Sequence, residues 1–493
     1  MIANLKKEEH RLAIITISSG LIMVQMCSRT LAMIVALVAI SAFGDVAHGA
    51  FKFVHNENNA FSQRIHWDDM GWTIALRFSP NSDDVFAAEK TGHIRWYENI
   101  GKQVHEYVTL AKLPAHHFDD RGLLGFAVHP EFPTMPYLYA LYTYGKKAGA
   151  SWIYKQCPVN PFIDPNGLSR CAATQKLVRL HVNPATKSMI GEPHTLMSGW
   201  CTVGTSHAVG DLKWAVDGSL LLSAGDGSTY QTGADVGIGG DGCYQPGASQ
   251  TLQGSFRSQY DNFLHGKLIR INPSALLKDS LLQVGADYSL SAKGLRNPYR
   301  MAVQPNTGDV FVGDVGASSF EEIDRIPNPV THPGVLNLGW PCMEGPEWSP
   351  QFASNREYVQ HCQSIAGSGV TLPFFSYRHG VDLPSLDQRD LCRGGSSSPT
   401  GIAFYPSGNS FGSKFDNVMF WLEGSKRCVF YFEKNANGDP DPQRLRTFMY
   451  STYEAGKPEK AGQFIDIAID KKTGHMYLVD VYTSAIIEVK RSH

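Results

Sequence analysis

The chain has 493 residues, of which 43% are hydrophobic and 18% are charged, and its formal net charge is −2. This hydrophobic content is ample for a folded core. The near-neutral charge and the lack of a basic cluster argue against a nucleic-acid partner and against binding to an anionic membrane.

The N-terminal segment differs from everything after it. Basic residues precede an apolar run from Leu31 to Phe43, and the small residues Ala47 and Gly49 follow at the spacing of a cleavage site. We therefore predict a signal peptide over residues 1–49 and a secreted, extracellular protein. A retained signal anchor is the alternative, and it would be the one reason to expect a membrane contact. Residues 50–70 are interpreted as a lead-in to the folded domain.

From residue 71 onward one pattern recurs: an apolar strand, a turn with Pro, Asp or Gly, and a second apolar strand. The six copies begin at Ala75, Gly125, Asp211, Met301, Gly401 and Asp466. A third strand follows each copy, and no long segment of helical period separates the copies, which disfavours a parallel α/β fold. The pattern predicts an all-β protein: one six-bladed β-propeller over residues 71–493, with antiparallel four-stranded blades around a central channel.

The longest insertion between strands covers residues 227–263. A loop of this length in a compact domain is more often a functional cover than filler. It contains Gly237, Gly239 and Gly242 in a GxGxxG spacing, but no helix follows, so we reject a dinucleotide site.

Cysteine usage agrees with export. The eight cysteines beyond the signal segment suggest up to four disulfides. Close spacing favours Cys157–Cys171 and Cys342–Cys362, and Cys201–Cys243 and Cys392–Cys428 would then close longer loops, although spacing alone does not fix the pairing.

Propeller geometry predicts where a site can lie, because the first strand of each blade lines the channel. Counting nine residues back from each turn gives six equivalent positions at one mouth of the channel: Gly71, Arg121, His207, Arg296, Ser397 and Gly462. This rim is polar and cationic, and its histidine can transfer a proton.

Two segments of the rim carry chemistry. His207 can act as a base near neutral pH, although a lone histidine is usually an ordinary polar group. Arg296 offers a planar fork for a carboxylate, and Asn297 adds a donor and an acceptor. The same residues also read as a turn fixed by Pro298. Arg300 is interpreted as a contact between blades.

Other polar residues recur outside the rim. Five carboxylates follow the second strands of their blades and are predicted to accept backbone N–H bonds in the next turn: Glu89, Asp226, Asp314, Glu423 and Asp480. Asp314 lies near Gly316 and Ala317, whose carbonyls are the kind of ligand that calcium uses. Lys426 and Arg427 are either a solvated pair or a basic contact above the mouth for an anionic ligand.

Several of these segments together resemble the glucose/sorbosone dehydrogenase family, which includes quinoprotein sugar dehydrogenases and hedgehog-interacting-protein-like ectodomains. The resemblance covers roughly residues 72–489. The motifs that carry it are RGLLGFAVHPEF from Arg121, SHAVGDLKWAVDG from Ser206, HGKLIRINP from His265, GLRNPYRMAVQPNTGDVFVGDVGASSFEEIDRI from Gly294, NLGWPCMEG from Asn337 and SSSPTGIAFYP from Ser396.

The resemblance implies a six-bladed propeller that binds pyrroloquinoline quinone (PQQ) and Ca²⁺ at the channel mouth and oxidises an aldose to a lactone. Its partners would be a small sugar and an external electron acceptor. The residues it implies are His207 as base with Arg296 at the reacting centre; Asp120, Arg121, Asn297, Lys426 and Arg427 as cofactor contacts; and the carbonyls of Gly316 and Ala317 as metal ligands.

The sequence departs from the quinoprotein pattern at three places. Asp120 stands where glucose dehydrogenases have glutamine, Ala317 replaces a proline, and a lysine expected before the fifth blade has only Arg378 as a substitute. The alternative function is therefore a non-catalytic secreted propeller that binds a protein or a glycan, as in the hedgehog-interacting proteins. A calcium-dependent lactonase-type hydrolase is a third interpretation.

Overall fold

The structure is a computed structural model that describes residues 51–54, 60–101, 106–145, 173–202, 205–228, 254–349, 356–367, 369–387, 392, 396–452 and 462–492. All of these belong to one unit, residues 48–493. The predicted signal segment, most of the 227–263 insertion and Cys157, Cys171 and Cys243 lie outside the described residues.

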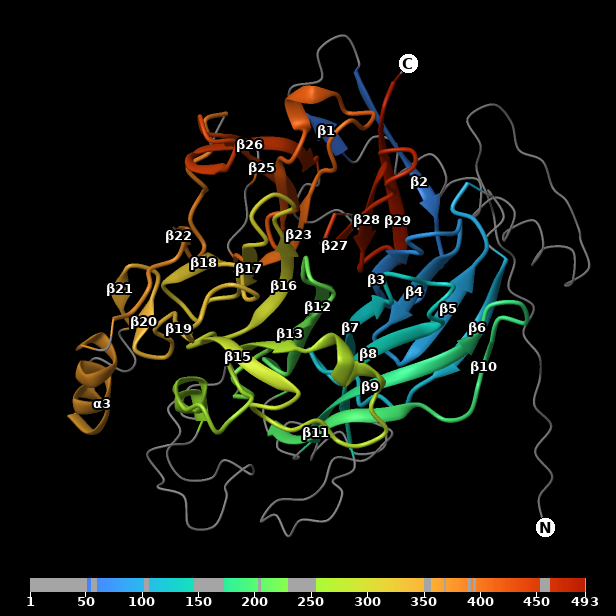
Figure 1. Ribbon diagram of the computed structural model, residues 1–493. Helices are drawn as coiled ribbons and strands as arrows, with labels where there is room; N and C mark the ends of the chain where they lie inside the picture. Colours follow the sequence, from blue (N-terminus) through green and yellow to red (C-terminus); the bar gives the residue numbers. More distant parts are fainter. Residues whose placement is uncertain are drawn as a thin grey trace, which may run out of the picture. The chain divides into compact units, whose positions relative to one another are not determined.

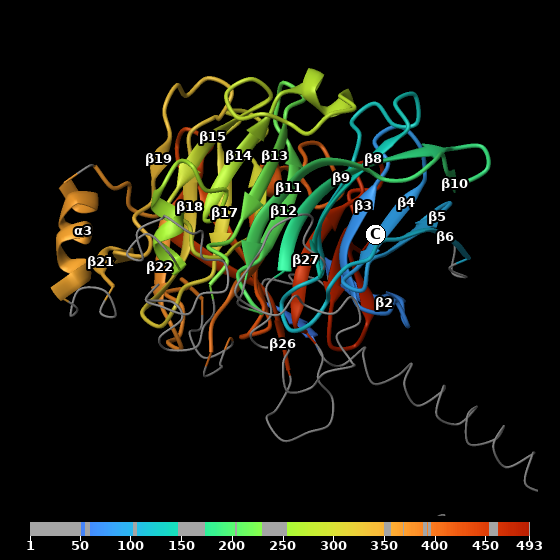
Figure 2. The same cartoon turned by 90° about the horizontal axis from the view of Figure 1, so that it is seen from below.

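Six sheets form the predicted six-bladed β-propeller, one sheet for each sequence repeat (Figures 1 and 2). Blade 1 contains β3 (Thr73–Phe78), β4 (Val85–Glu89), β5 (His93–Tyr97) and β6 (Tyr107–Lys112). Blade 2 contains β7 (Leu123–Val128), β8 (Tyr137–Tyr144), β9 (Ala173–Asn183), β10 (Ser188–Met189) and β11 (His194–Thr202). Blade 3 contains β12 (Val209–Trp214), β13 (Leu220–Ala224), β14 (Lys267–Ile271), β15 (Tyr288–Lys293) and β19 (Leu336–Asn337).

The other three blades follow in chain order. Blade 4 contains β16 (Pro298–Val303), β17 (Val310–Asp314), β18 (Phe320–Ile326) and β22 (Phe375–Arg378). Blade 5 contains β23 (Pro399–Phe404), β24 (Met419–Glu423), β25 (Cys428–Lys434), β26 (Pro440–Ser451) and β1 (Phe51–Phe53). Blade 6 contains β27 (Phe464–Ile469), β28 (Met476–Asp480), β29 (Ala485–Arg491) and β2 (Phe61–Trp67).

The blades depart from the predicted four antiparallel strands in two ways. Blades 2, 3 and 5 each have a fifth strand. In blade 3 that strand is β19, which pairs with β15 in parallel. The elements outside the blades are the hairpin β20 (Met343–Glu344) and β21 (Glu347–Trp348), the helix α3 (Arg356–Gly367), and the 3₁₀ helices η6 (Gly254–Gln259), η7 (Pro273–Leu277) and η9 (Ser413–Phe415).

Two of the expected disulfides are present. Cys342–Cys362 ties α3 to the turn before β20, and Cys392–Cys428 ties β25 to the segment before β23. Cys201 is also disulfide-bonded. Within the described part of the chain, no helix is both long and apolar enough to cross a membrane.

The blades pack through alternating side chains, as a pleated strand requires. In β17, Val310 and Val312 belong to an apolar cluster with Leu268 of blade 3. Phe311, on the opposite face of the same strand, packs in a cluster with Trp421 of blade 5. β17 is therefore covered on both faces, and all five of its residues are buried.

Buried charges join the inner strands, which are the first strands of the blades. Arg77 of β3 binds Asp466 of β27 at 2.5 Å and Asp211 of β12 at 3.0 Å. Arg300 of β16 donates to the carbonyl of Ile74 at 2.8 Å, as its interpretation as an inter-blade contact predicts. Burial would raise the pKa of Asp211, but the charges of Lys213, Arg77 and Arg300 hold it below its usual value.

Two N-terminal strands complete the last blades of the ring. β2 pairs with β29 on the outside of blade 6, and β1 pairs with β26 on the outside of blade 5. At the first of these junctions Arg64 lies opposite Glu488 and forms an ion pair with it. The segment interpreted as a lead-in thus contains strands of the propeller. Their pairing covers the outer edges of blades 5 and 6, where backbone donors and acceptors would otherwise be exposed.

The six predicted rim positions are confirmed as equivalent. Each lies two residues before the start of an inner strand, from Gly71 before Thr73 to Gly462 before Phe464. Every inner strand also has a register shift just after its first paired residue. A bulge bends the strand and redirects nearby side chains, so the same local device shapes the rim in all blades.

We expect the stability of the β2–β29 junction to fall in acid. Burial would raise the pKa of Glu488, but hydrogen bonds from His475 and Arg64 hold it at about 2, below the ordinary 4.5. The stabilisation is therefore present above about pH 4.5 and is lost as the pH falls toward 2. Arg64 is 38% exposed, so solvent weakens its ion pair with Glu488. Glu488→Gln should therefore lower the free energy of unfolding by about 1–2 kcal/mol at pH 7.

Denaturant unfolding at a series of pH values measures this effect. The difference between Glu488→Gln and the wild type should vanish near pH 2, and Glu192→Gln, at an exposed position, should behave as the wild type throughout. A difference independent of pH would contradict the ion-pair explanation.

Candidate functional site

Backbone N–H groups at the rim are held by the carboxylates that end the second strands. Asp314 accepts the N–H groups of Arg296 at 2.8 Å and Asn297 at 2.5 Å. Glu423 likewise accepts the N–H groups of Ser398 and Lys426. Asp480 does so for Gly462 and Tyr482. The predicted structural role is confirmed at these three positions, and each carboxylate fixes the rim of its own blade.

Glu89 and Asp226 differ from that rule. Glu89 ends β4 as predicted, but its carboxylate pairs with the side chain of Arg95. The grouping of Asp226 with the others is corrected, because the register places Ala224 at the equivalent position in blade 3. Asp226 lies two residues further on, and this offset lets its side chain reach His207, while Oδ1 still accepts the N–H of Ser228 in the next turn, as predicted.

His207 is buried and has a left-handed backbone conformation, with φ of 51°. This conformation costs a residue with a side chain about 1–2 kcal/mol. The carbonyl of His207 accepts the N–H of Gly227 at 2.9 Å, and a Cβ on Gly225 would lie only 2.3 Å from the same carbonyl oxygen. The Gly225-Asp226-Gly227 turn therefore both requires its first glycine and holds the histidine in place.

Asp226 orients the imidazole. His207 Nδ1 lies 3.0 Å from Asp226 Oδ1, which also accepts the N–H of Ser228, and Asp226 Oδ2 accepts the indole N–H of Trp340 at 2.9 Å. Burial would raise the pKa of Asp226, but the charge and hydrogen bond of His207, with Arg296 and Ser228, hold it below its usual value. The ionised carboxylate can accept a hydrogen bond from Nδ1–H, an arrangement that leaves Nε2 as the ring nitrogen able to accept a proton.

Arg296 lies beside this pair. Its carbonyl accepts the N–H of Asp226 at 2.8 Å, and its guanidinium stands 5.3 Å from the ring centre of Trp340. Nη1 donates to the carbonyls of Val315 and Gly316 at 2.9 and 2.7 Å. The Nε group is buried and donates to no described residue. His207, Asp226, Arg296 and Trp340 thus form one cluster, contributed by blade 3, blade 4 and the segment between β19 and β20.

Two glutamates that lie outside the turn after β17 fix its backbone. The N–H groups of Ala317, Ser318, Ser319 and Phe320 all point to one oxygen of Glu344, and the N–H of Gly316 donates to Glu321. Glu321 also binds His379 Nδ1 at 2.6 Å, and this hydrogen bond raises the pKa of His379. Gly316 and Ala317 therefore lie in a fixed turn directly beside Arg296.

Asp120 and Arg121 occupy the rim of blade 2 in different ways. Asp120 is exposed at the surface. The nearby protein displaces water from its carboxyl group and, together with the charge of Asp119, raises its pKa, while the charges of Lys90, His207 and Arg296 act against this rise. Arg121 is fully buried and donates to the carbonyl of Thr202 at 3.2 Å. Of the two, Asp120 opens to the mouth.

The two basic residues of blade 5 also differ. Lys426 is buried, whereas Arg427 is half-buried with its guanidinium 5.7 Å from the ring centre of Tyr482. Arg378, considered above as a substitute lysine, pairs with Glu347 at 2.7 Å. No contact joins any of these three to the His207 cluster in the described residues.

Sequence reasoning missed three parts of the site: Trp340, Glu344 and the Glu321–His379 pair. Trp340 and Glu344 lie within the NLGWPCMEG motif, which marks the segment but gives no reason to place its indole on Asp226. Glu321 was interpreted only as part of a third strand. Each role depends on contacts between residues at least 24 positions apart, apart from the Gly316–Glu321 hydrogen bond.

Cavities lie at the inner strands and, separately, beside the outer strands β11 and β15. One of about 700 Å³ is lined by the far ends of β3, β7, β12 and β27, opposite the rim. A smaller one of about 260 Å³ is lined by Cys201, Arg257 and His265. Neither is lined by His207 or Arg296, so the His207 cluster lies outside both cavities.

Comparisons with known proteins agree with this architecture. The family model described as glucose/sorbosone dehydrogenase matches residues 69–381. Quinoprotein glucose dehydrogenase B of Acinetobacter calcoaceticus is 24% identical over 312 residues, and the match spans 63% of this chain but only 59% of that protein.

Solved structures show the same fold. The PQQ-bound aldose sugar dehydrogenase of Streptomyces coelicolor aligns with a TM-score of 0.55 at 15% identity, covering 90% of this chain and 98% of that one. The calcium structure of a Trichoderma reesei carbohydrate-active enzyme of family AA12 aligns with a TM-score of 0.57 at 11% identity, covering 91% and 98%.

We expect Gly225→Ala to disturb the His207 cluster, since its Cβ would lie 2.3 Å from the carbonyl oxygen of His207. Overpacking of this kind should lower the free energy of unfolding by about 1–3 kcal/mol. Gly334→Ala is the matched control, because its Cβ would meet only His332, at 3.7 Å. Equal unfolding midpoints for the two variants in denaturant would contradict the close approach.

Proposed function

The chain belongs to the glucose/sorbosone dehydrogenase family, and we propose that it is a secreted sugar dehydrogenase that uses PQQ and Ca²⁺ to oxidise the anomeric hydroxyl of an aldose to a lactone. An external acceptor would then remove the electrons. The observation that carries the proposal is the His207–Asp226 pair beside Arg296 at the rim, because a propeller that only binds a partner has no need of an oriented base.

The residues at the rim fit a polycarboxylate cofactor. Arg296 has a buried Nε that donates to no described residue, and such a donor is satisfied by an anionic oxygen. Asn297 follows it at the rim, and Arg427 supplies a second cation in blade 5. When bound, a quinone supplies an acceptor for a hydride. Asp120 would face the same mouth, and Arg121 would support the rim from beneath.

The fit to calcium involves backbone oxygens. The carbonyls of Gly316 and Ala317 are hard ligands in a turn held by Glu321 and Glu344. Arg296 Nη1 already donates to the Gly316 carbonyl, which leaves that oxygen one lone pair for a cation.

His207 would remove the proton. Its Nε2 would accept the proton of the anomeric hydroxyl while the hydrogen on the anomeric carbon leaves as hydride. Two electrons thus leave the sugar with the hydride, and a C=O bond forms. Asp226 stabilises the imidazolium through its contact at 3.0 Å. Arg296 would stabilise negative charge that develops on the acceptor oxygens.

Reconstitution tests the proposal. The purified chain is mixed with Ca²⁺ and PQQ, binding is followed by absorbance, and dye reduction is followed with a panel of aldoses. We expect a bound quinone and aldose-dependent reduction. A folded sample that binds no quinone would sink the dehydrogenase proposal and favour a binding propeller.

His207→Ala should reduce turnover about 10²–10⁴-fold, the range for loss of a general base, while quinone binding is kept. Asp226→Asn should fall between this variant and the wild type, because the imidazole remains but loses its orienting charge. The control is His332→Ala, at an exposed position, which should leave turnover unchanged. Full turnover by His207→Ala would show that the base is another group.

A further inference from the structure

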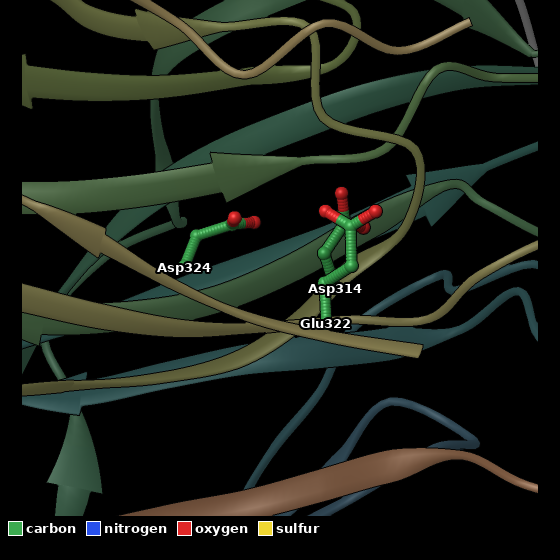
Figure 3. Close-up of side chains that lie close together, drawn as sticks. All are labelled: Asp314, Glu322 and Asp324. Carbon is green, nitrogen blue, oxygen red and sulfur yellow. The ribbon is translucent and has the colours of Figure 1, made fainter. Parts of the chain in front are cut away.

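Three buried carboxylates meet on the two middle strands of blade 4, β17 and β18. Oxygens of Asp314, Glu322 and Asp324 all lie within 4.8 Å of one another, and the three residues are buried (Figure 3). Asp314 ends β17 and pairs directly with Glu322 of β18, while Asp324 pairs with Val312 one step along the ladder. The antiparallel register thus places all three on one face of the sheet.

That face is otherwise apolar. Val310 and Val312 of β17 and Ile326 of β18 share it by the two-residue alternation of a strand, and they pack in one cluster with Leu268 of blade 3. The carboxylates therefore occupy positions between two blades where β-branched residues would ordinarily lie. Burying ionised groups at such positions is costly unless an opposite charge joins them.

Asp324 gives a second, separate observation. Its side chain is fully buried, and neither of its oxygens accepts a hydrogen bond from any residue that the structure describes. Figure 3 shows its carboxylate extending toward those of Asp314 and Glu322. Burial and the nearby carboxylates raise the pKa values of Asp324 and Glu322 well above their usual range. A buried acceptor with no donor, aimed at two other carboxylates, is a place for a cation.

We propose that Asp314, Glu322 and Asp324 bind one divalent cation of the calcium class, separate from any cation held by backbone carbonyls at the rim. The three carboxylates offer six oxygens, and calcium takes six to eight oxygen ligands at about 2.3–2.6 Å. One oxygen from each residue lies within 4.8 Å of the others, which is close enough for all three to bind the same ion at these distances. The all-oxygen set disfavours zinc and copper, which prefer nitrogen and sulfur.

The proposed cation connects to the rim through Asp314. Both oxygens of Asp314 accept backbone N–H groups, from Arg296 and from Asn297. Glu322 accepts the N–H of Gly345, and so contacts the segment that carries Trp340. A cation between these carboxylates would fix the side chain of Asp314 and, through its two hydrogen bonds, the rim backbone. It is a positioning site, and no step of sugar oxidation passes through it.

Calcium binding without quinone tests the site. The full chain is treated with a chelator and titrated with Ca²⁺ by calorimetry, and the unfolding temperature is measured with and without Ca²⁺. We expect the wild type to bind Ca²⁺ and to be stabilised by it. Asp324→Asn, which keeps the side-chain size, should bind one ion fewer per chain and lose the stabilisation.

The matched control is Asp309→Asn in the same blade. Asp309 lies before β17 and pairs with Arg325 at 2.7 Å, outside the cluster, so this variant should bind Ca²⁺ as the wild type does. Unchanged binding by Asp324→Asn, or no binding by the wild type in the absence of quinone, would overturn the proposal. The dehydrogenase proposal is judged separately, by quinone binding and by aldose-dependent dye reduction.

A second measurement does not depend on a variant that folds. Crystals of the wild type grown with Tb³⁺, a substitute for Ca²⁺, should show an anomalous peak between the three carboxylates. A peak only at the rim carbonyls, or none at all, would mean that the cluster holds protons and no metal.

Discussion

The arrangement of the blades depends on charges buried where the inner strands meet. Arg77 of β3 bridges Asp466 of β27 and Asp211 of β12, and Arg300 of β16 reaches the backbone of β3. A buried ion pair adds little stability over well-packed apolar groups, but removing one partner costs about 3–5 kcal/mol. These contacts therefore fix the height of one inner strand relative to the next more than they add to stability.

The common height of the inner strands brings equivalent positions of the six sequence repeats together at one mouth of the channel. Because the inner strands start at equivalent positions and bend at the same place, the residues two positions before them form one rim. Of the six rim positions, only that of blade 3 carries a histidine. In blade 3, Gly225 and the offset of Asp226 break the repeat, and they place a buried carboxylate against His207. The chemistry of the rim arises where the repeat is broken.

Blade 4 joins the rim to the interior. Asp314 holds the backbone of Arg296 and Asn297 from beneath, while on its other side it meets Glu322 and Asp324. The turn that follows is fixed by Glu344 and Glu321. Acidic residues thus hold both the rim backbone of blade 4 and the turn beside Arg296.

The sequence by itself determined the strands, the six-fold count and the rim, because turn residues and two-residue alternation are local signals. It also indicated the Cys342–Cys362 and Cys392–Cys428 disulfides, which the structure confirms. Only the tertiary structure decided that Asp226 and Trp340 meet at His207, that β1 and β2 complete blades 5 and 6, and that Asp324 joins Asp314. These contacts depend on blade packing, register and closure of the ring, which link residues distant in sequence and leave no periodic trace in it.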